Sequence, residues 1–171
     1  MSPQGTLLLS VDEGSPTTKN LLTRDGRAIL VNFIRRNVIY HFNFKAAPTC
    51  LAFSPSGRFF AVGLGKQLQI WRTPAFDEAK EREFAPFVKY RTYNGHYKDI
   101  TSVNWSGDSR FLVTTGKDLT ARVWSLDPVE GFTPTTLSGH RDTVAGAYFS
   151  ADQEIVCHFW STLTIDLYSE S

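Results

Sequence analysis

An internal repeat constrains this chain more than any other feature of its sequence. Gly95-His96 recurs as Gly139-His140, 44 residues further on. Each pair precedes a run of alternating apolar and polar residues that ends in an aromatic residue and a serine, at Trp105-Ser106 and at Phe149-Ser150. A third such run, which lacks the Gly-His pair, ends at Phe53-Ser54. Because a repeated unit forms the same supersecondary structure each time, the sequence predicts an array of similar units.

Short β-strands are predicted throughout each unit. A polar turn follows every aromatic-Ser pair, and a second apolar run begins directly after that turn. A third run ends two of the units, at Trp71 and at Trp124. Short alternating runs at even spacing, separated by turn signals, are typical of an all-β fold. No window has a convincing helical period, so we expect an all-β chain.

The unit from Gly95 to Trp124 resembles the WD repeat, in which Gly-His stands near the start and Trp near the end of about 40 to 45 residues. Each WD repeat forms one four-stranded blade of a β-propeller. In this family a hydrogen-bonded network holds the blade together, and the resemblance implies that its members here are His96, Thr114, Asp118 and Trp124. An aspartate acceptor, a histidine with two ring nitrogens, a hydroxyl and an indole N–H can satisfy one another in such a chain.

The other units carry only parts of this network. In the unit that ends at Trp71, Val62 stands at the hydroxyl position, and a one-residue gap falls where the aspartate should be. We therefore expect apolar contacts alone to hold that blade. Near the N-terminus, Ser10 and Asp25 take the hydroxyl and aspartate positions as a degenerate network, once an 11-residue insertion at 14–24 is set aside.

The spacing also predicts the blade boundaries. The first blade spans residues 6–45 with the insertion 14–24, the second 49–92 and the third 95–137, and the fourth begins with 139–156. Beyond residue 156 the 44-residue offset no longer matches residue types. We therefore predict that residues 1–156 form an incomplete WD-repeat β-propeller of about three to four blades, and that residues 157–171 form an unmatched tail.

Composition and charge exclude several classes of function. Lys plus Arg number 18 against 17 for Asp plus Glu, so the net charge of +1 lacks the basic excess of a dedicated nucleic-acid module. No apolar run approaches the ~20 residues of a membrane-spanning helix, and we expect no signal peptide. The two cysteines, Cys50 and Cys157, stand far apart, which argues against a disulfide scaffold or a cysteine zinc site.

Three patterns could carry chemistry, and each has a simpler structural interpretation. His96 and Asp118 could act with the hydroxyl of Ser102 or Thr114 as base, orienting group and nucleophile, but the blade network explains the same residues. The segment 63–66, Gly-Leu-Gly-Lys, lacks the full spacing of a phosphate-binding loop and is favoured as a turn between strands. The four histidines are too scattered for a metal motif. We therefore assign no catalytic, cofactor or metal site and predict that the chain is not an enzyme.

Sequence outside the shared repeat pattern resembles a narrower family. Five stretches resemble the periodic tryptophan protein 2 family, in the early part of its first propeller: Asp25–Phe33, Arg36–Phe44, Glu83–Val88, Asp108–Phe111 and Gly139–Asp142. The resemblance covers residues 5–13 and 25–156. It implies a non-catalytic nucleolar scaffold of the small-subunit processome, the particle in which ribosomal RNA precursor is processed.

The resemblance also implies partners. These are other WD-repeat subunits of the processome, with precursor ribosomal RNA and small nucleolar RNA contacted indirectly within the particle, and no membrane. The residues alone leave an alternative open, which is an unrelated WD-repeat adaptor for signalling or ubiquitin-ligase complexes. Co-purification separates the two hypotheses, because the first requires other processome subunits among the bound proteins.

Overall fold

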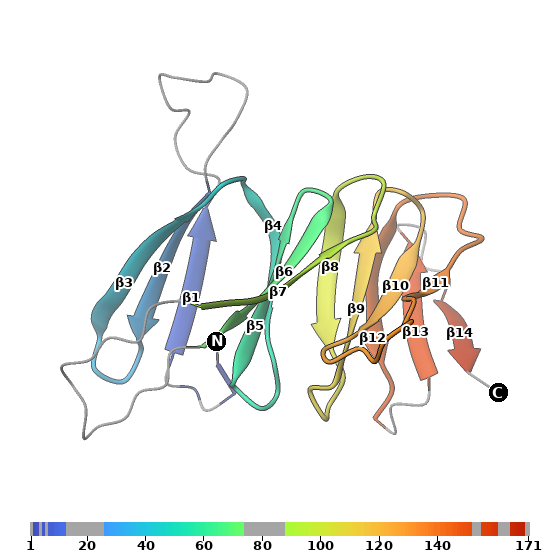
Figure 1. Cartoon of the computed structure of the whole chain (residues 1–171). Helices are drawn as coiled ribbons and strands as arrows, with labels where there is room; N and C mark the ends of the chain where they lie inside the picture. The colour runs from blue at the N-terminus through green and yellow to red at the C-terminus, as the bar shows by residue number, and fades with distance from the viewer. Residues whose placement is uncertain are drawn as a thin grey trace, which may run out of the picture.

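The chain is built from small antiparallel sheets (Figure 1). The computed structural model describes residues 2, 3, 5, 7–12, 26–73, 88–151, 155–160 and 165–169, with backbone alone for 11, 12, 39, 155–160 and 165–169. Every regular element in this part of the chain is a β-strand. The strands are β1 Leu7–Asp12, β2 Gly26–Asn32, β3 Asn37–Phe44, β4 Pro48–Phe53, β5 Phe59–Leu64, β6 Gln67–Arg72, β7 Val88–Asn94, β8 Ile100–Trp105, β9 Phe111–Gly116, β10 Ala121–Ser125, β11 Thr135–Leu137, β12 Val144–Phe149, β13 Ile155–Trp160 and β14 Ile165–Ser169.

The strands form four sheets, which we call blades 1 to 4. Their orders are β1-β2-β3, β4-β5-β6-β7, β8-β9-β10-β11 and β12-β13-β14, so within each sheet the strands that follow one another in sequence are neighbours. Strand β8, the first strand of blade 3, lies against the first strands of blades 2 and 4, β4 and β12. The all-β prediction and the incomplete WD-repeat propeller are therefore confirmed. The predicted insertion at 14–24 and Asp25 lie outside the described residues. The described residues contain no helix of the length and apolarity needed to span a membrane.

The register of strand pairing is the same in all four blades. Trp124 lies opposite Leu112 in blade 3, and Trp71 lies opposite Phe60 at the equivalent position of blade 2. In blade 1 the equivalent pair is Val31 with Leu8. In blade 4 it is Tyr168 with Val156, at an offset of 44 residues from the pair in blade 3. The backbone repeat thus continues where the residue types no longer match.

This register corrects the predicted C-terminal boundary. Residue 156 lies inside β13, which pairs with β12 on one side and with β14 on the other. Residues 157–160 and 165–169 therefore belong to the sheet of blade 4 rather than to a tail outside the repeat. The prediction was wrong because it compared residue types, whereas strand pairing uses main-chain groups that every residue except proline carries in full.

The core lies between the faces of neighbouring blades. Alternating side chains of one strand point to opposite faces, so blade 2 uses one face against blade 1 and the other against blade 3. Phe60 and Val62 face blade 1, where they pack against Leu9 and Leu30. The adjacent Ala61 faces blade 3 within a second cluster. At ~25 cal/mol per Å² of buried apolar surface, this face-to-face packing is the main source of stability.

Polar side chains join the blades at their edges. The indole N–H of Trp105 donates to the carbonyl of Ala52 in blade 2 at 3.1 Å. On the other side, the amide of Asn104 donates to the carbonyl of Ala147 in blade 4 at 2.8 Å. Strand β8 is therefore tied to both of its neighbours by side chains from consecutive residues, which fixes how far one blade can slide along the next.

A serine turn connects the first two strands of each complete blade. In blade 3 the Phe111 amide donates to Ser106 Oγ at 2.9 Å, and in blade 2 the Phe59 amide donates to Ser54 Oγ at 3.1 Å. The Leu7 amide donates in the same way to Ser2 Oγ, at 3.0 Å. Ser2 therefore occupies the position of Ser54 and Ser106, and the turn that precedes β1 is formed as in the other blades.

Candidate functional site

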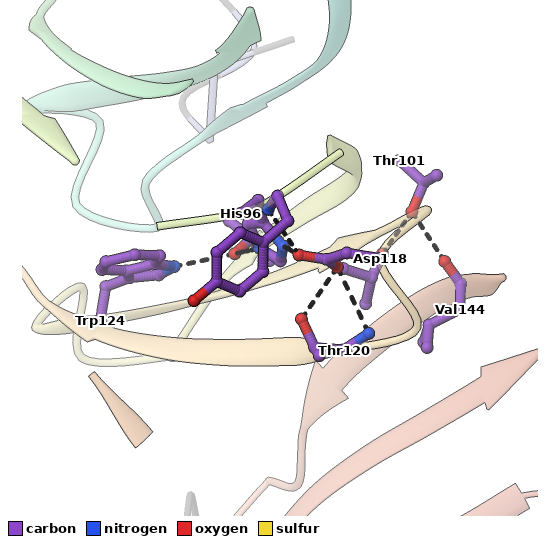
Figure 2. A network of polar contacts seen from close by, with 9 residues as sticks. His96, Thr101, Asp118, Thr120, Trp124 and Val144 are labelled. Carbon is purple, nitrogen blue, oxygen red and sulfur yellow. Dashed lines mark hydrogen bonds and ion pairs between the residues drawn. The ribbon is translucent and has the colours of Figure 1, made fainter. Parts of the chain in front are cut away.

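The four residues predicted to form a network in blade 3 meet in the structure (Figure 2). Each comes from a different part of the blade. His96 lies in the link between β7 and β8, Thr114 in the middle of β9, Asp118 in the turn between β9 and β10, and Trp124 in β10. Strand pairing places Thr114 and Trp124 on one face of the sheet. Trp124 lies opposite Leu112, and Leu112 and Thr114 are two residues apart on β9.

The hydrogen bonds form a single directed chain. Trp124 Nε1 can only donate, and it lies 2.8 Å from Thr114 Oγ1. The hydroxyl therefore accepts from Trp124 and uses its own hydrogen toward His96 Nε2, also at 2.8 Å. His96 is then neutral and carries its proton on Nδ1, which donates to Asp118 Oδ2 at 3.0 Å. Every polar group in the chain has a partner of the opposite kind.

Asp118 also holds the surrounding backbone. Its Oδ2 accepts from the Tyr97 amide at 2.9 Å, and its Oδ1 accepts from the Thr120 hydroxyl at 2.9 Å. The carboxylate thus fixes both the link that carries His96 and the turn that carries Asp118 itself. A short polar acceptor in a turn commonly satisfies nearby amides in this way.

Two glycines make room for the network. A Cβ on Gly116 would lie 2.7 Å from both His96 Nδ1 and Asp118 Oδ1. A Cβ on Gly95 would lie 2.8 Å from the Trp124 ring. Gly95, which marks the start of the repeat in the sequence, is therefore required by the close approach of the chain to the indole.

The protonation states follow from burial and from the hydrogen bonds. Burial lowers the pKa of His96, and this outweighs the attraction of Asp118, which acts to raise it. Burial acts to raise the pKa of Asp118, but hydrogen bonds from the Tyr97 amide, His96 and the Thr120 hydroxyl together lower it. At neutral pH the pair is therefore a neutral imidazole donating to a carboxylate.

The order aspartate, histidine and hydroxyl is also the order of a nucleophilic triad. In blade 3, however, the Thr114 side chain is fully buried, with 0% exposure, and its oxygen already accepts from Trp124. Ser102 Oγ instead accepts from the amide of Asn104, at 3.4 Å, and Asn104 is not a member of the network. A nucleophile must reach its substrate, so the arrangement fits a structural network better than a catalytic one.

Blade 2 replaces the network by apolar packing. Phe44 occupies the position of His96, and its ring lies 5.8 Å from that of Trp71 in an edge-on arrangement. Val62, at the hydroxyl position, is fully buried. Trp71 Nε1 is buried and has no hydrogen-bond partner among the described residues. The sequence predicted the loss of the network but not the phenylalanine in place of the histidine.

The remaining repeat positions have different environments. Ser10 is exposed on the face of blade 1 that points away from blade 2, so the part of the degenerate network that is described makes no buried contact. Its proposed partner Asp25 is outside the described residues. His140 is buried at the start of blade 4, directly after Gly139, whose φ of 111° lies in the range that favours glycine. The side chains expected to meet His140 are not among those described.

The structure also shows the segment 63–66 and the remaining described histidine, both considered above from the sequence. The segment 63–66 contains the tight turn between β5 and β6, with Gly65 at a φ of 58°. His41 is exposed on β3. Within the described ranges, no group of three or more histidine, cysteine, aspartate or glutamate side chains is arranged to hold a metal ion.

Sequence reasoning missed two residues that the fold uses. Ser2 forms the turn before β1, and the pattern Ser-Pro-x-Gly, which occurs at residues 2–5 and again at 54–57, could have identified it. Phe44 could have been found by counting back from the aromatic-Ser pair of blade 2 by the distance that separates His96 from Trp105. Both signals depend on aligning units by a feature other than Gly-His.

Comparison with known families agrees with this geometry. The model of the WD domain, G-beta repeat, matches residues 37–72 and 87–125, which include most of blades 2 and 3. These two segments of the chain are WD repeats. Similarity to individual proteins is stronger still, and it confirms the resemblance to the periodic tryptophan protein 2 family.

Three relatives show the extent of this similarity. The periodic tryptophan protein 2 homolog of Schizosaccharomyces pombe is 53% identical over 91% of this chain, and periodic tryptophan protein 2 of Saccharomyces cerevisiae is 54% identical over 90%. The Mus musculus homolog is 33% identical over 100% of the chain. The chain spans 17%, 15% and 16% of the lengths of these three relatives.

The first prediction concerns the carboxylate of the WD-repeat network. Asp118→Ala is expected to lower the free energy of unfolding by roughly 1 to 3 kcal/mol, because it leaves His96 Nδ1 and the Tyr97 amide without their acceptor. Urea unfolding followed by tryptophan fluorescence measures the change. The matched control is Asp99→Ala, which removes an exposed ion pair with Lys117 and is expected to cost less than about 1 kcal/mol. Equal effects of the two substitutions would contradict the network.

The second prediction compares the two equivalent tryptophans. Trp124→Phe and Trp71→Phe remove similar ring volume, but Trp124 loses a hydrogen bond, whereas the N–H of Trp71 has no partner in the part of the chain that the structure describes. Trp124→Phe is therefore expected to destabilise by about 1 kcal/mol more than Trp71→Phe. Thermal and urea unfolding of both variants provide the measurement, and a larger cost at Trp71 would overturn the assignment.

The third prediction is an acid destabilisation. Because folding lowers the pKa of His96 below its unfolded value of 6.5, the unfolded chain takes up a proton below about pH 6.5 that the folded chain does not. Stability is therefore expected to fall as the pH drops below that value, and to fall further below about pH 4, where the lowered pKa of Asp118 acts in the same direction. Urea midpoints between pH 7.5 and 5 test this, and His96→Asn should flatten the dependence.

Proposed function

We propose that this chain is a non-catalytic interaction scaffold in ribosome biogenesis, acting within the small-subunit processome to support processing of ribosomal RNA precursor. The observation that carries the proposal is the identity of 53% and 54% to periodic tryptophan protein 2 relatives over 91% and 90% of the chain. Similarity at this level extends well beyond the positions that every WD repeat shares. The nucleolus is the corresponding location.

The architecture supports a scaffold rather than an enzyme. Apolar faces and buried side chains fill the spaces between the blades, and the most enzyme-like group, His96 with Asp118 and Thr114, is enclosed within blade 3. The turns and links at the two ends of the blades carry exposed side chains, among them Tyr97 and Arg110. Rigid sheets that carry short links at fixed positions are well suited to hold several partners at once.

The partners follow from the same proposal. They are other WD-repeat subunits of the processome, together with precursor ribosomal RNA and small nucleolar RNA in the same particle. A net charge of +1 supports indirect rather than direct contact with the RNA, because phosphate binding depends on accumulated positive charge.

Affinity purification tests the proposal. The tagged chain, expressed in Saccharomyces cerevisiae cells, is expected to co-purify with processome proteins and with unprocessed ribosomal RNA precursor, and to localise to the nucleolus. The matched control is the same chain with Asp118→Ala, which should lose recovery in proportion to its loss of stability. Recovery of signalling or ubiquitin-ligase components in place of processome proteins would favour the alternative adaptor function and overturn the proposal.

A further inference from the structure

The end of the propeller that carries the network also carries an exposed aromatic residue. Tyr97 follows His96 in the β7–β8 link, and 75% of it is exposed to solvent. Its amide is held by Asp118 Oδ2 at 2.9 Å, so the buried network fixes the backbone from which the ring projects. A large side chain that is both exposed and attached to a rigid site is typical of an anchor at a protein interface.

Arg122 backs the ring of Tyr97. Its guanidinium carbon lies 5.6 Å from the ring centroid, a cation–π contact. The Nε of Arg122 is buried without a hydrogen-bond partner among the described residues. Tyrosine, arginine and tryptophan are the residue types most enriched among the few residues that contribute most of the binding energy at protein interfaces. The pair therefore offers an aromatic surface beside a cation, and both are oriented before any partner arrives.

Equivalent positions in the neighbouring blades extend this surface. Lys45 follows Phe44 and Arg141 follows His140, just as Tyr97 follows His96, and both are exposed. The three residues lie in links that lead into the first strands of successive blades, β4, β8 and β12, so they share one end of the propeller (Figure 1). They form a row across three blades with an aromatic residue at its centre.

The charge of this end is positive. Two hairpin turns adjoin the β7–β8 link. The carbonyl of Gly65, in the β5–β6 turn, accepts from the Ile100 amide at 2.8 Å, and the amide of Lys117, in the β9–β10 turn, donates to the carbonyl of Asp99. The described links and turns at this end, together with Arg122 near the start of β10, carry six cationic side chains against three anionic ones. The cationic residues are Lys45, Lys66, Lys98, Lys117, Arg122 and Arg141, and the anionic ones are Asp99, Asp118 and Asp142.

The anionic groups are already engaged within the fold. Asp118 is buried in the network, Asp99 pairs with Lys117 at 3.0 Å, and Asp142 accepts from the Thr143 amide at 2.6 Å. Among the described residues of this end the excess is three positive charges, in a chain whose total is +1, and this favours an anionic partner. RNA would be bound by several aromatic residues in succession on such a surface, and this row has one.

We propose that the surface formed by Lys45, Tyr97, Lys98, Arg122 and Arg141, here called the Tyr97 surface, binds an acidic segment of a partner protein that packs an apolar side chain on Tyr97. The proposal deepens the scaffold function by naming one of its contact surfaces. The carboxylates of the acidic segment meet the cations of the row, and the apolar residue of the segment covers the face of the Tyr97 ring that Arg122 leaves open. Charge complementarity then sets the orientation of the segment across the blades.

A binding assay with defined probes tests the proposal on the full chain. The first probe is a fluorescein-labelled 12-residue peptide of Glu and Asp with a central Phe, followed by fluorescence anisotropy. The second replaces each acidic residue by Lys, and the third is a 12-nucleotide oligouridylate of the same label. The acidic peptide is expected to bind at least tenfold more tightly than the other two, and its affinity should fall as salt is added.

Substitutions locate the binding. Tyr97→Ala and Arg141→Glu are each expected to weaken acidic-peptide binding at least fivefold, and both residues are exposed, so thermal unfolding should remain unchanged. The matched controls are Arg110→Glu, an exposed arginine in the turn at the opposite end of blade 3, and Tyr148→Ala, an exposed tyrosine on β12. Neither control should alter binding.

Two results would overturn the proposal. One is an equal loss with Arg110→Glu, which would show unspecific attraction by charge. The other is tighter, Tyr97-dependent binding of the oligouridylate than of the acidic peptide, which would make this end an RNA surface. Either result is distinct from failure of the scaffold function, because co-purification with the processome is measured independently of the peptide.

Discussion

The hydroxyl of Thr114 is the contact on which the third blade depends. It accepts from Trp124 on the neighbouring strand and donates to His96, which lies in the link from the preceding blade. One buried oxygen therefore joins two strands of a sheet to the segment that leads into it. Because all three groups are buried, loss of any one leaves an unpaired polar atom, at a cost of about 1 to 3 kcal/mol.

The same blade geometry also forms with apolar residues at the positions of the network. In blade 2, Phe44 and Val62 stand where His96 and Thr114 stand in blade 3, and Trp71 packs on Phe44 in place of a hydrogen bond to a hydroxyl. Strand register and blade order are unchanged. The propeller geometry therefore depends on main-chain pairing and on apolar faces, and the network adds specificity and rigidity to one blade.

Rigidity at this point bears on interaction with partners. Asp118 holds the Tyr97 amide, so the buried network determines where an exposed aromatic side chain stands. A binding surface that is ordered in advance loses less conformational freedom when a partner docks. The WD-repeat network can thus contribute to recognition without touching the partner, through the backbone it holds.

The sequence by itself determined the all-β architecture and the repeat, which depend on alternation, turn residues and a Gly-His to Trp spacing, all visible along the chain. The members of the blade 3 network followed from the resemblance of that unit to the WD repeat. Only the tertiary structure decided that Ser2 forms a blade turn, that Phe44 replaces a histidine, that β13 and β14 continue the fourth sheet, and that Lys45, Tyr97 and Arg141 share one end. The physical reason is that strand pairing uses main-chain groups, so equivalent positions can carry unrelated side chains, and an alignment of the units on their Gly-His pairs does not detect them.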